Sequence, residues 1–247
     1  MAVNLVEVFT SIQGEGPYTG VRQVFIRFSG CNLSCCYCDT DFSLRPYFRV
    51  ETNPGQGDFI SLSNPVETDT VAAIIKGNVS ATAVHSISVT GGEPLLHTEF
   101  IKRLGTILKE WGFRIYLETN GTLPENLVKV MPVIDIISMD IKLPETSGYD
   151  NLWDRHAEFL QRGSEKEIFV KVVVSSETKK STLLKTCNLI KEVNQDIPLI
   201  IQPVTSYEGL QVKSLCVKEL MKMQKMALHY ISDVRVIPQM HKIMGQL

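Results

Sequence analysis

The densest chemistry in this sequence lies in "CNLSCCYCDT", residues 31–40, which holds four of the chain's six cysteines. Cys31, Cys35 and Cys38 form a C-x3-C-x2-C pattern directly after a β-rich run that ends at "FSG". A structural zinc site usually takes four ligands in two separated pairs, and the pattern lacks a second pair. Three clustered thiolates suit a 4Fe–4S cluster with one iron open to a non-protein ligand. From the spacing alone, a zinc site remains an alternative.

The other three cysteines are expected to play no part in this chemistry. Cys36 would break the C-x3-C-x2-C spacing, and a small residue filling a turn is a sufficient explanation for it. Cys187 and Cys216 stand singly in helical patterns with apolar neighbours. Because free cysteine is among the most buried residue types, we expect both to be ordinary core thiols.

Polar or glycine-rich segments close four of the later β-rich runs. They are "TGGEP" (90–94), "LETNG" (117–121), "SMDIK" (138–142) and "IIQPV" (200–204). The adjacent glycines of the first segment allow a ligand to approach the backbone closely, although a simple turn would also explain them. Ligands bind at the carboxyl ends of parallel strands, so we expect these segments to converge on one cleft.

The elements that must position these residues alternate between two patterns. Segments with helical spacing separate short apolar runs. One example is "TEFIKRLGTILKEWG", in which Phe100, Leu104 and Leu108 recur every four residues. This alternation indicates an α/β fold, and we predict an incomplete parallel (βα) barrel of about six strands. Eight full βα units would not fit in 247 residues that also hold a long loop. The β-rich runs lie at residues 22–28, 86–90, 114–119, 134–142, 168–175, 198–204 and 234–238.

The whole chain, 1–247, is expected to form a single domain, because we find neither a linker nor an internal repeat. One segment breaks the rhythm of strands and helices. Residues 43–67, "SLRPYFRVETNPGQGDFISLSNPVE", are rich in Pro, Gly, Ser and Asn. We predict an irregular insertion there, directly after the cysteine loop.

The composition limits the possible partners and the compartment. A net charge of −2 without a run of Lys or Arg argues against a nucleic-acid surface. The sequence has no apolar stretch long enough for a membrane span, and its first residues do not look like a signal peptide. We therefore expect a cytoplasmic protein with reduced thiols, and neither a nucleic-acid nor a membrane partner.

The cysteine pattern, with Tyr37 directly before Cys38 and "GGEP" further along, resembles the radical S-adenosylmethionine (radical SAM) superfamily. Three further segments resemble the 7-carboxy-7-deazaguanine synthase family within it. These are "SIQGEGPYTGVRQVFIRFSGCNLSC", "CDTDF" and "VIPQMHK". The resemblance extends from about residue 5 to residue 245 and is weakest across residues 43–67.

This resemblance implies a radical SAM lyase. Its substrate would be 6-carboxy-5,6,7,8-tetrahydropterin and its product 7-carboxy-7-deazaguanine, with loss of ammonia, in the synthesis of queuosine and other 7-deazapurines. The implied cofactors are a 4Fe–4S cluster, S-adenosyl-L-methionine and Mg²⁺. A 5′-deoxyadenosyl radical would carry the chemistry, so no side chain is expected to act as catalytic acid or base. The family further implies a homodimer and a one-electron donor such as a flavodoxin or ferredoxin.

The resemblance also implies roles for individual residues. Cys31, Cys35 and Cys38 would hold the cluster, and Thr40 would bind Mg²⁺. The pterin would contact Ile12, Gln13, Gly14, Arg27 and Thr90. S-adenosylmethionine would contact Tyr37, Cys38, Asp39, Gly92, Ser138, Met139, Asp140, Gln202, Pro203, Val204 and Thr205.

Some alternatives stay open. By itself, Arg27 would be read as a surface residue of a strand, and only the family pattern assigns it to a carboxylate. Glu118 suits either a ribose hydroxyl or a turn, and His241 either the active site or a structural role. Two other functions compete with the lyase: a glycyl-radical-enzyme activating protein, which shares the cysteine motif, and a zinc-stabilised binding module.

Overall fold

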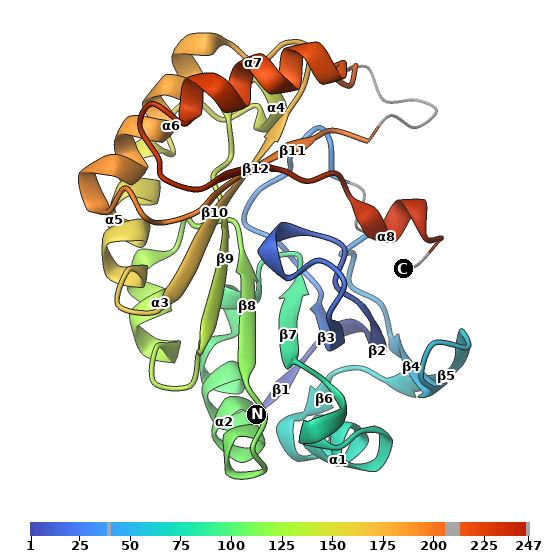
Figure 1. Ribbon diagram of the computed structural model, residues 1–247. Helices are drawn as coiled ribbons and strands as arrows, with labels where there is room; N and C mark the ends of the chain where they lie inside the picture. Colours follow the sequence, from blue (N-terminus) through green and yellow to red (C-terminus); the bar gives the residue numbers. More distant parts are fainter. Residues whose placement is uncertain (39–40, 206–212, 246–247) are drawn as a thin grey trace.

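The structure is a computed structural model that describes residues 1–38, 41–205 and 213–245. Its centre is a curved sheet with the strand order β12-β11-β10-β9-β8-β7-β3-β2-β4-β5, drawn in Figure 1. A two-stranded sheet of β1 (Ala2–Val3) and β6 (Val66–Glu67) lies beside it. The large sheet is an open arc, because its first and last strands do not pair.

The arc from β3 to β12 is parallel throughout, which confirms the predicted incomplete parallel barrel. Every β-rich run predicted from the sequence forms one of its strands. The described residues form one strand more than the "about six" that we predicted. The strands are β3 (Arg22–Phe28), β7 (Ser86–Gly91), β8 (Ile115–Thr119), β9 (Ile136–Asp140), β10 (Glu167–Val174), β11 (Leu199–Pro203) and β12 (Val234–Val236).

Helices cover the outer face of this arc, as Figure 1 shows. In α2, the predicted stripe of Phe100, Leu104 and Leu108 is at most 2% exposed. The helices are α1 (Thr68–Asn78), α2 (Thr98–Glu110), α3 (Pro124–Val130), α4 (Pro144–Ser147), α5 (Trp153–Gly163), α6 (Lys180–Val193), α7 (Val217–Ala227) and α8 (Met240–Ile243). None of the described helices is long and apolar enough to cross a membrane.

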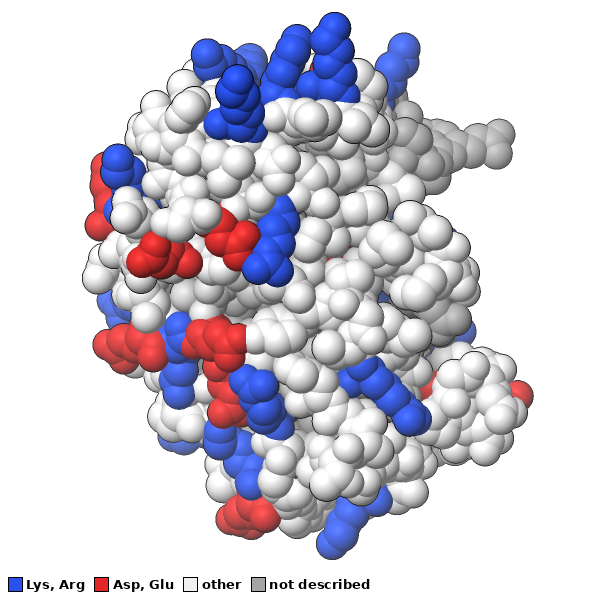
Figure 2. Space-filling model, in the orientation of Figure 1, with Lys and Arg blue, Asp and Glu red and all other residues white. Residues whose placement is uncertain are grey.

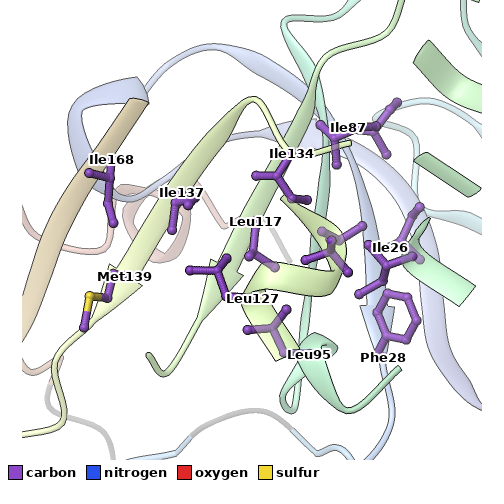
Figure 3. Close-up of a cluster of buried hydrophobic side chains, with 14 of the residues drawn as sticks. Ile26, Phe28, Ile87, Leu95, Leu117, Leu127, Ile134, Ile137, Met139 and Ile168 are labelled. Atoms are coloured by element: carbon purple, nitrogen blue, oxygen red, sulfur yellow. The ribbon is translucent and has the colours of Figure 1, made fainter. Parts of the chain in front are cut away.

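The hydrophobic core lies between the sheet and the helices (Figure 3). Ile137 and Met139 of β9 belong to it, together with Leu117 of β8 and Leu127 of α3. Because successive side chains of a strand point to opposite faces, Ser138 and Asp140 of β9 point into the barrel. The same alternation turns Glu118 of β8 inward, so the barrel interior carries polar groups.

Three further strands, β2, β4 and β5, extend the sheet beyond β3. β2 (Leu5–Ile12) pairs antiparallel with β3, and β4 (Tyr47–Asn53) forms a hairpin with β5 (Asp58–Ser63) that joins β2. The prediction of an irregular insertion at 43–67 was therefore wrong. The hairpin forms because Phe48 and Val50 of β4 pack into the core at 1% and 3% exposure. Of the Pro and Gly residues that suggested irregularity, Pro54, Gly55 and Gly57 lie between the two strands, whereas Pro46 precedes β4 and Pro65 follows β5.

The two isolated cysteines differ in their burial. Cys187 on α6 is fully buried, as predicted. Cys216 is exposed, so the prediction of a core thiol was wrong there. Helix α7 begins at Val217, and Cys216 is its N-cap; the Cys216 backbone N–H donates to Glu219 Oε2 at 2.9 Å. The residue thus caps the helix instead of facing the core.

Charges are distributed unevenly over the surface. On the face drawn in Figure 2, basic and acidic side chains are mixed on the left and in the lower part of the view, and most of the right half is uncharged. Basic side chains predominate at the top of that view, over α7. This helix carries Lys218, Lys222 and Lys225.

Candidate active site

A cavity of about 350 Å³ lies at the carboxyl ends of the parallel strands. All four of the segments that were predicted to converge contribute to its wall. From "TGGEP" come Thr90 and Gly92, and from "LETNG" come Glu118 and Asn120. "SMDIK" and "IIQPV" supply further wall residues, so the predicted cleft is present.

Most of the site residues predicted from the sequence line this one cavity. Those of the cysteine loop are Cys31, Cys35, Tyr37 and Cys38. The others are Ile12, Gln13, Gly14, Arg27, Thr90, Gly92, Ser138, Asp140, Gln202, Val204 and Thr205.

Two predicted residues, Met139 and Pro203, are placed differently, and two others lie outside the described residues. The Met139 side chain is fully buried in the core, so only its backbone remains for a ligand contact. Pro203 ends β11 and borders a smaller neighbouring pocket. Asp39 and Thr40 lie outside the described residues. The predicted magnesium ligand, Thr40, is therefore one of the residues that the structure does not describe.

The cysteine loop presents three thiols to the cavity and turns one away. Cys36 is exposed and donates from Sγ to the Thr146 carbonyl oxygen at 2.5 Å. Burial raises the pKa of Cys31 and raises that of Cys35 to about 11. The protein alone would therefore keep these thiols protonated, and thiolates there need a strongly cationic partner, as bound iron provides.

The donor set fits a cluster better than a single ion. The described residues include no group of three His, Cys, Asp or Glu side chains close enough to hold one metal ion. Nevertheless, Cys31, Cys35 and Cys38 line the same cavity and interact electrostatically. Each thiolate of a 4Fe–4S cube binds a different iron, so the ligands stand further apart than around one ion.

The two glycines of "TGGEP" allow its backbone to pack against the cysteine loop. Gly91 has φ +117°, and a Cβ on Gly92 would lie 1.8 Å from the Gly30 carbonyl oxygen. The Gly92 N–H donates to Phe28 O at 3.0 Å, and the Glu93 N–H donates to Gly30 O at 2.9 Å. Side chains at these positions would separate the two segments.

Two buried oxygens on the cavity wall lack a hydrogen-bond partner in the described part of the chain. They are Asp140 Oδ1 on β9 and Gln202 Oε1 on β11. Buried acceptors are costly unless they receive a donor. Both therefore fit a ligand with hydroxyl or amino groups, such as the ribose or the methionyl end of S-adenosylmethionine.

Glu118 organises another part of the wall. Its carboxylate accepts hydrogen bonds at 2.9 Å from Gln13 Nε2, from Ser88 Oγ and from Thr90 Oγ1. These contacts orient two of the predicted pterin residues, Gln13 and Thr90. Glu118 thus lies on β8 in the cavity wall and not at a turn, where the second of its two open interpretations would have placed it.

Arg27 also faces the cavity, and its side chain is 23% exposed. Its Nε lies 3.3 Å from Glu7 Oε1, and its guanidinium lies over the Phe9 ring with 5.4 Å to the ring centroid. Glu7 also pairs with Arg49. Arg27 is thus held in place by β2, with its fork beside the cavity.

The sequence analysis missed a buried ion pair on the opposite wall. Glu15 pairs with Lys171 of β10 and accepts hydrogen bonds from Gln202 Nε2 at 3.1 Å and Gln239 Nε2 at 2.9 Å. Burial alone would raise the pKa of Glu15, but Lys171, the Gln239 amide and His241 lower it to about 2. A lysine within the apolar run "IFVKVVVS" was the signal that could have indicated this pair.

Lys142 is a second cation that the sequence analysis passed over, at the end of "SMDIK". Its Nζ donates to Asp140 Oδ2 and to Tyr37 Oη, both at 2.8 Å. Nearby carboxylate and phenol oxygens raise the pKa of Lys142 against the opposing effect of burial. Lys142 therefore stays charged and links the cysteine loop to β9.

The C-terminal segment closes one side of the cavity. Gln239, His241 and Lys242 line it, and the Met240 N–H donates to the Gly14 carbonyl oxygen at 2.9 Å. A Cβ on Gly14 would lie 2.4 Å from His241 Nδ1. His241 therefore reaches the cavity, as one of its two open interpretations expected.

Comparison with known proteins identifies the family of this chain. Residues 25–173 match the radical SAM superfamily. A 7-carboxy-7-deazaguanine synthase from Geobacter sulfurreducens is 46% identical, covering 98% of this chain and 97% of the relative. One from Methanocaldococcus jannaschii is 36% identical, covering 98% and 99%.

The crystal structure of QueE from Escherichia coli aligns with a TM-score of 0.63 at 23% identity, covering 98% of this chain and 95% of that one. At that identity the alignment supports the fold. The family match and the sequence relatives make the assignment: the chain belongs to the radical SAM superfamily and, within it, to the 7-carboxy-7-deazaguanine synthase family.

Proposed function

We propose that this protein converts 6-carboxy-5,6,7,8-tetrahydropterin to 7-carboxy-7-deazaguanine with loss of ammonia, as a radical SAM lyase of 7-deazapurine biosynthesis. One observation carries the proposal beyond family membership. The cysteine loop, the glycine pair and the Gln13–Arg27–Thr90–Glu118 wall share a single cavity. A radical source and a polar pocket for a flat heterocycle thus lie side by side.

The cluster would be held by Cys31, Cys35 and Cys38, with S-adenosylmethionine on its open iron. The cluster and this cofactor supply a 5′-deoxyadenosyl radical when bound. The backbone at Gly92 leaves room for the cofactor, and Asp140 Oδ1 and Gln202 Oε1 offer it buried acceptors. Lys142 and Tyr37 hold the cysteine loop against β9.

The substrate would lie against the β2–β3–β7–β8 wall, which carries Gln13, Arg27, Thr90 and Glu118. A guanidinium matches the two oxygens of a carboxylate, so Arg27 would take the pterin carboxylate. Gln13 and Thr90, held by Glu118, would meet the donor and acceptor groups of the ring edge. Ile12 and Gly14 would complete this side of the pocket.

Magnesium belongs to the proposal through Thr40. Mg²⁺ keeps most of its waters and takes one or two protein ligands plus anionic groups of the substrate. A single threonine hydroxyl would not hold the ion alone, so metal and pterin are expected to bind together. A magnesium titration of turnover with wild type and Thr40→Ala tests this point, and identical curves would remove Thr40 as a ligand.

The remaining parts of the proposal concern the setting. The reaction needs a one-electron donor, such as a flavodoxin or ferredoxin, and the family suggests a homodimer. A cytoplasmic location suits unpaired thiols and a cluster, because that compartment keeps thiols reduced.

Anaerobic incubation with 6-carboxytetrahydropterin, S-adenosylmethionine and a reductant, followed by mass analysis, tests the function directly. The expected products are 7-carboxy-7-deazaguanine and ammonia. Glycyl-radical-enzyme activation needs no pterin, so pterin-independent activity on a partner protein would favour that alternative. A colourless protein that binds zinc and no iron would favour the zinc-stabilised module.

A further inference from the structure

Three polar side chains beside Cys31 form a closed ring of hydrogen bonds. Asn120 Nδ2 donates to Asn32 Oδ1 at 2.8 Å, and Asn32 Nδ2 donates to Thr122 Oγ1 at 2.9 Å. Thr122 Oγ1 in turn donates to Asn120 Oδ1 at 2.5 Å. All three donors point the same way around the ring, so each group both gives and receives a hydrogen bond.

The ring fixes which end of the Asn120 amide faces the cysteine. Asn120 Oδ1 accepts from both the N–H and the hydroxyl of Thr122, at 3.1 and 2.5 Å. A flipped amide would set its NH₂ group against the Thr122 N–H and its oxygen against Asn32 Oδ1. The NH₂ group therefore points towards the cysteine loop, and its second N–H lies 3.9 Å from Cys31 Sγ, measured from Nδ2.

The ring is held firmly in the structure. Asn120 and Thr122 are 6% and 5% exposed. The Asn120 backbone N–H donates to Glu93 Oε2 at 2.8 Å, and Glu93 is fully buried in the "TGGEP" segment. The amide therefore has little freedom to turn away from the sulfur.

We propose that Asn120 is a positioning residue of the cluster, whose side-chain N–H donates to the Cys31 thiolate and raises the reduction potential of the cluster. The Leu33 backbone N–H supplies a second donor, 3.4 Å from the same sulfur. Reduction adds negative charge that spreads onto the ligand sulfurs, so N–H donors stabilise the reduced state more than the oxidised one. The ring of Asn32, Asn120 and Thr122 orients the Asn120 side-chain N–H towards the Cys31 sulfur. The inference rests on the proposed cluster at Cys31, Cys35 and Cys38.

The decisive measurement is a potentiometric titration of the anaerobically reconstituted protein, followed by electron paramagnetic resonance. Asn120→Asp replaces the donor with a carboxylate of the same shape. Thr122→Val opens the ring without adding charge. Asn78→Asp is the matched control. Asn78 Nδ2 also donates a partly buried hydrogen bond, to Glu51 O at 3.1 Å, but Asn78 lies at the end of α1 and away from the cavity.

We expect Asn120→Asp to lower the ratio of reduced to oxidised cluster at least about tenfold at a fixed potential, which is about 59 mV for a one-electron couple. Thr122→Val should shift the ratio in the same direction by less, and Asn78→Asp should leave it unchanged. Iron and sulfide contents separate the two proposals. Without iron and sulfide in the wild type, the proposed function fails; with full contents and unshifted potentials in both variants, the role of Asn120 fails. If Asn120→Asp assembles no cluster, the neutral Thr122→Val variant decides.

Discussion

At the residue scale, the cavity is built from polar side chains that the protein has already paired before any ligand arrives. Arg27 forms an ion pair with Glu7, Lys171 with Glu15, and Lys142 with Asp140. Each pair compensates part of the cost of burying charge. What remains unpaired, such as Asp140 Oδ1, marks where ligand groups are needed.

Arg27 provides the first prediction. Arg27→Ala removes a charge-assisted contact to the pterin carboxylate, which is worth about 2–5 kcal/mol when desolvated. We expect pterin turnover to fall accordingly, while cleavage of S-adenosylmethionine without substrate persists. Both are measured by anaerobic product analysis. Arg22 begins the same strand and is exposed, so Arg22→Ala is the matched control. Normal turnover of the Arg27 variant would make that arginine a surface residue.

The sequence predicted those site residues that stand in a local pattern. The cysteines, the glycine pair and the polar strand ends can be recognised because spacing or a strand end identifies them. Lys171 could be noticed only as a lysine in an apolar run, and Glu15 and Gln239 could not be recognised, since their partners are up to 224 positions away along the chain. Their function depends on the closure of the barrel, and single residues of these types usually lie at the surface.

At the element scale, the seven strands of the parallel arc were predicted, whereas β2 and the β4–β5 hairpin were not. β2 was missed because Glu7, Thr10 and Ser11 interrupt its apolar pattern, although all three are buried. The β4–β5 hairpin was missed because its connection is rich in Pro and Gly. It is anchored by Glu51, whose carboxylate accepts from the Thr10 N–H at 2.9 Å and from Gly55 and Gly57 at 2.9 and 3.2 Å.

Glu51 therefore provides a prediction about the hairpin. Glu51→Ala leaves three backbone N–H groups without their acceptor, and we expect the free energy of unfolding to fall by about 2 kcal/mol. Glu51→Gln keeps one oxygen acceptor and should lose less. Urea unfolding compares the free energies, and hydrogen exchange of Gly55 and Gly57 locates the change. Equal stability of the wild type and the alanine variant would show that the carboxylate does not anchor the hairpin.

His156 on α5 connects the turns that follow β8 and β9. Its Nε2 accepts from the Lys142 N–H at 3.2 Å, and its Nδ1 lies 3.1 Å from the Gly121 carbonyl oxygen. Both contacts suit a neutral ring with the proton on Nδ1. Burial lowers the pKa of His156 from its usual 6.5 to about 4.

This shift predicts a pH dependence of stability. Between pH 6.5 and 4 the unfolded chain binds a proton at His156 and the folded protein does not, so stability falls as the pH falls. From pH 7.5 to 5 the contribution of His156 to this fall should be about 2 kcal/mol. His156→Gln should lack it, although its stability at pH 7.5 is lower. Urea unfolding at several pH values measures both slopes, and parallel slopes would contradict the assignment.

At the scale of the whole molecule, the fold followed from the alternation of strands and helices, which local hydrophobic patterns encode. The sequence did not show that residues 13–15 lie against residues 239–241. The C-terminal segment crosses the open side of the cavity and contacts the loop after β2. Gln239 bonds to Glu15 and, at 2.7 Å, accepts from Thr205 Oγ1. Residues from both ends of the sequence thereby complete one pocket.

Gly14 tests whether this closure matters for the reaction. An added Cβ would lie 2.4 Å from His241 Nδ1 and 2.5 Å from the His241 backbone nitrogen, so Gly14→Ala must displace the segment. Overpacking of this kind costs about 1–3 kcal/mol. We expect KM for the pterin to rise several-fold, with iron content and substrate-free cleavage of S-adenosylmethionine unchanged.

The matched control for Gly14→Ala is Gly77→Ala. Gly77 lies in helix α1, and a Cβ there meets no atom within 4 Å. Alanine is the better helix former by about 1 kcal/mol, so this variant should be at least as stable as the wild type and equally active. Steady-state kinetics and urea unfolding of both variants separate a local change from a general effect of alanine. If Gly14→Ala keeps its KM, the C-terminal segment does not shape the pterin pocket, and the substrate must be held by the β2–β3–β7–β8 wall alone.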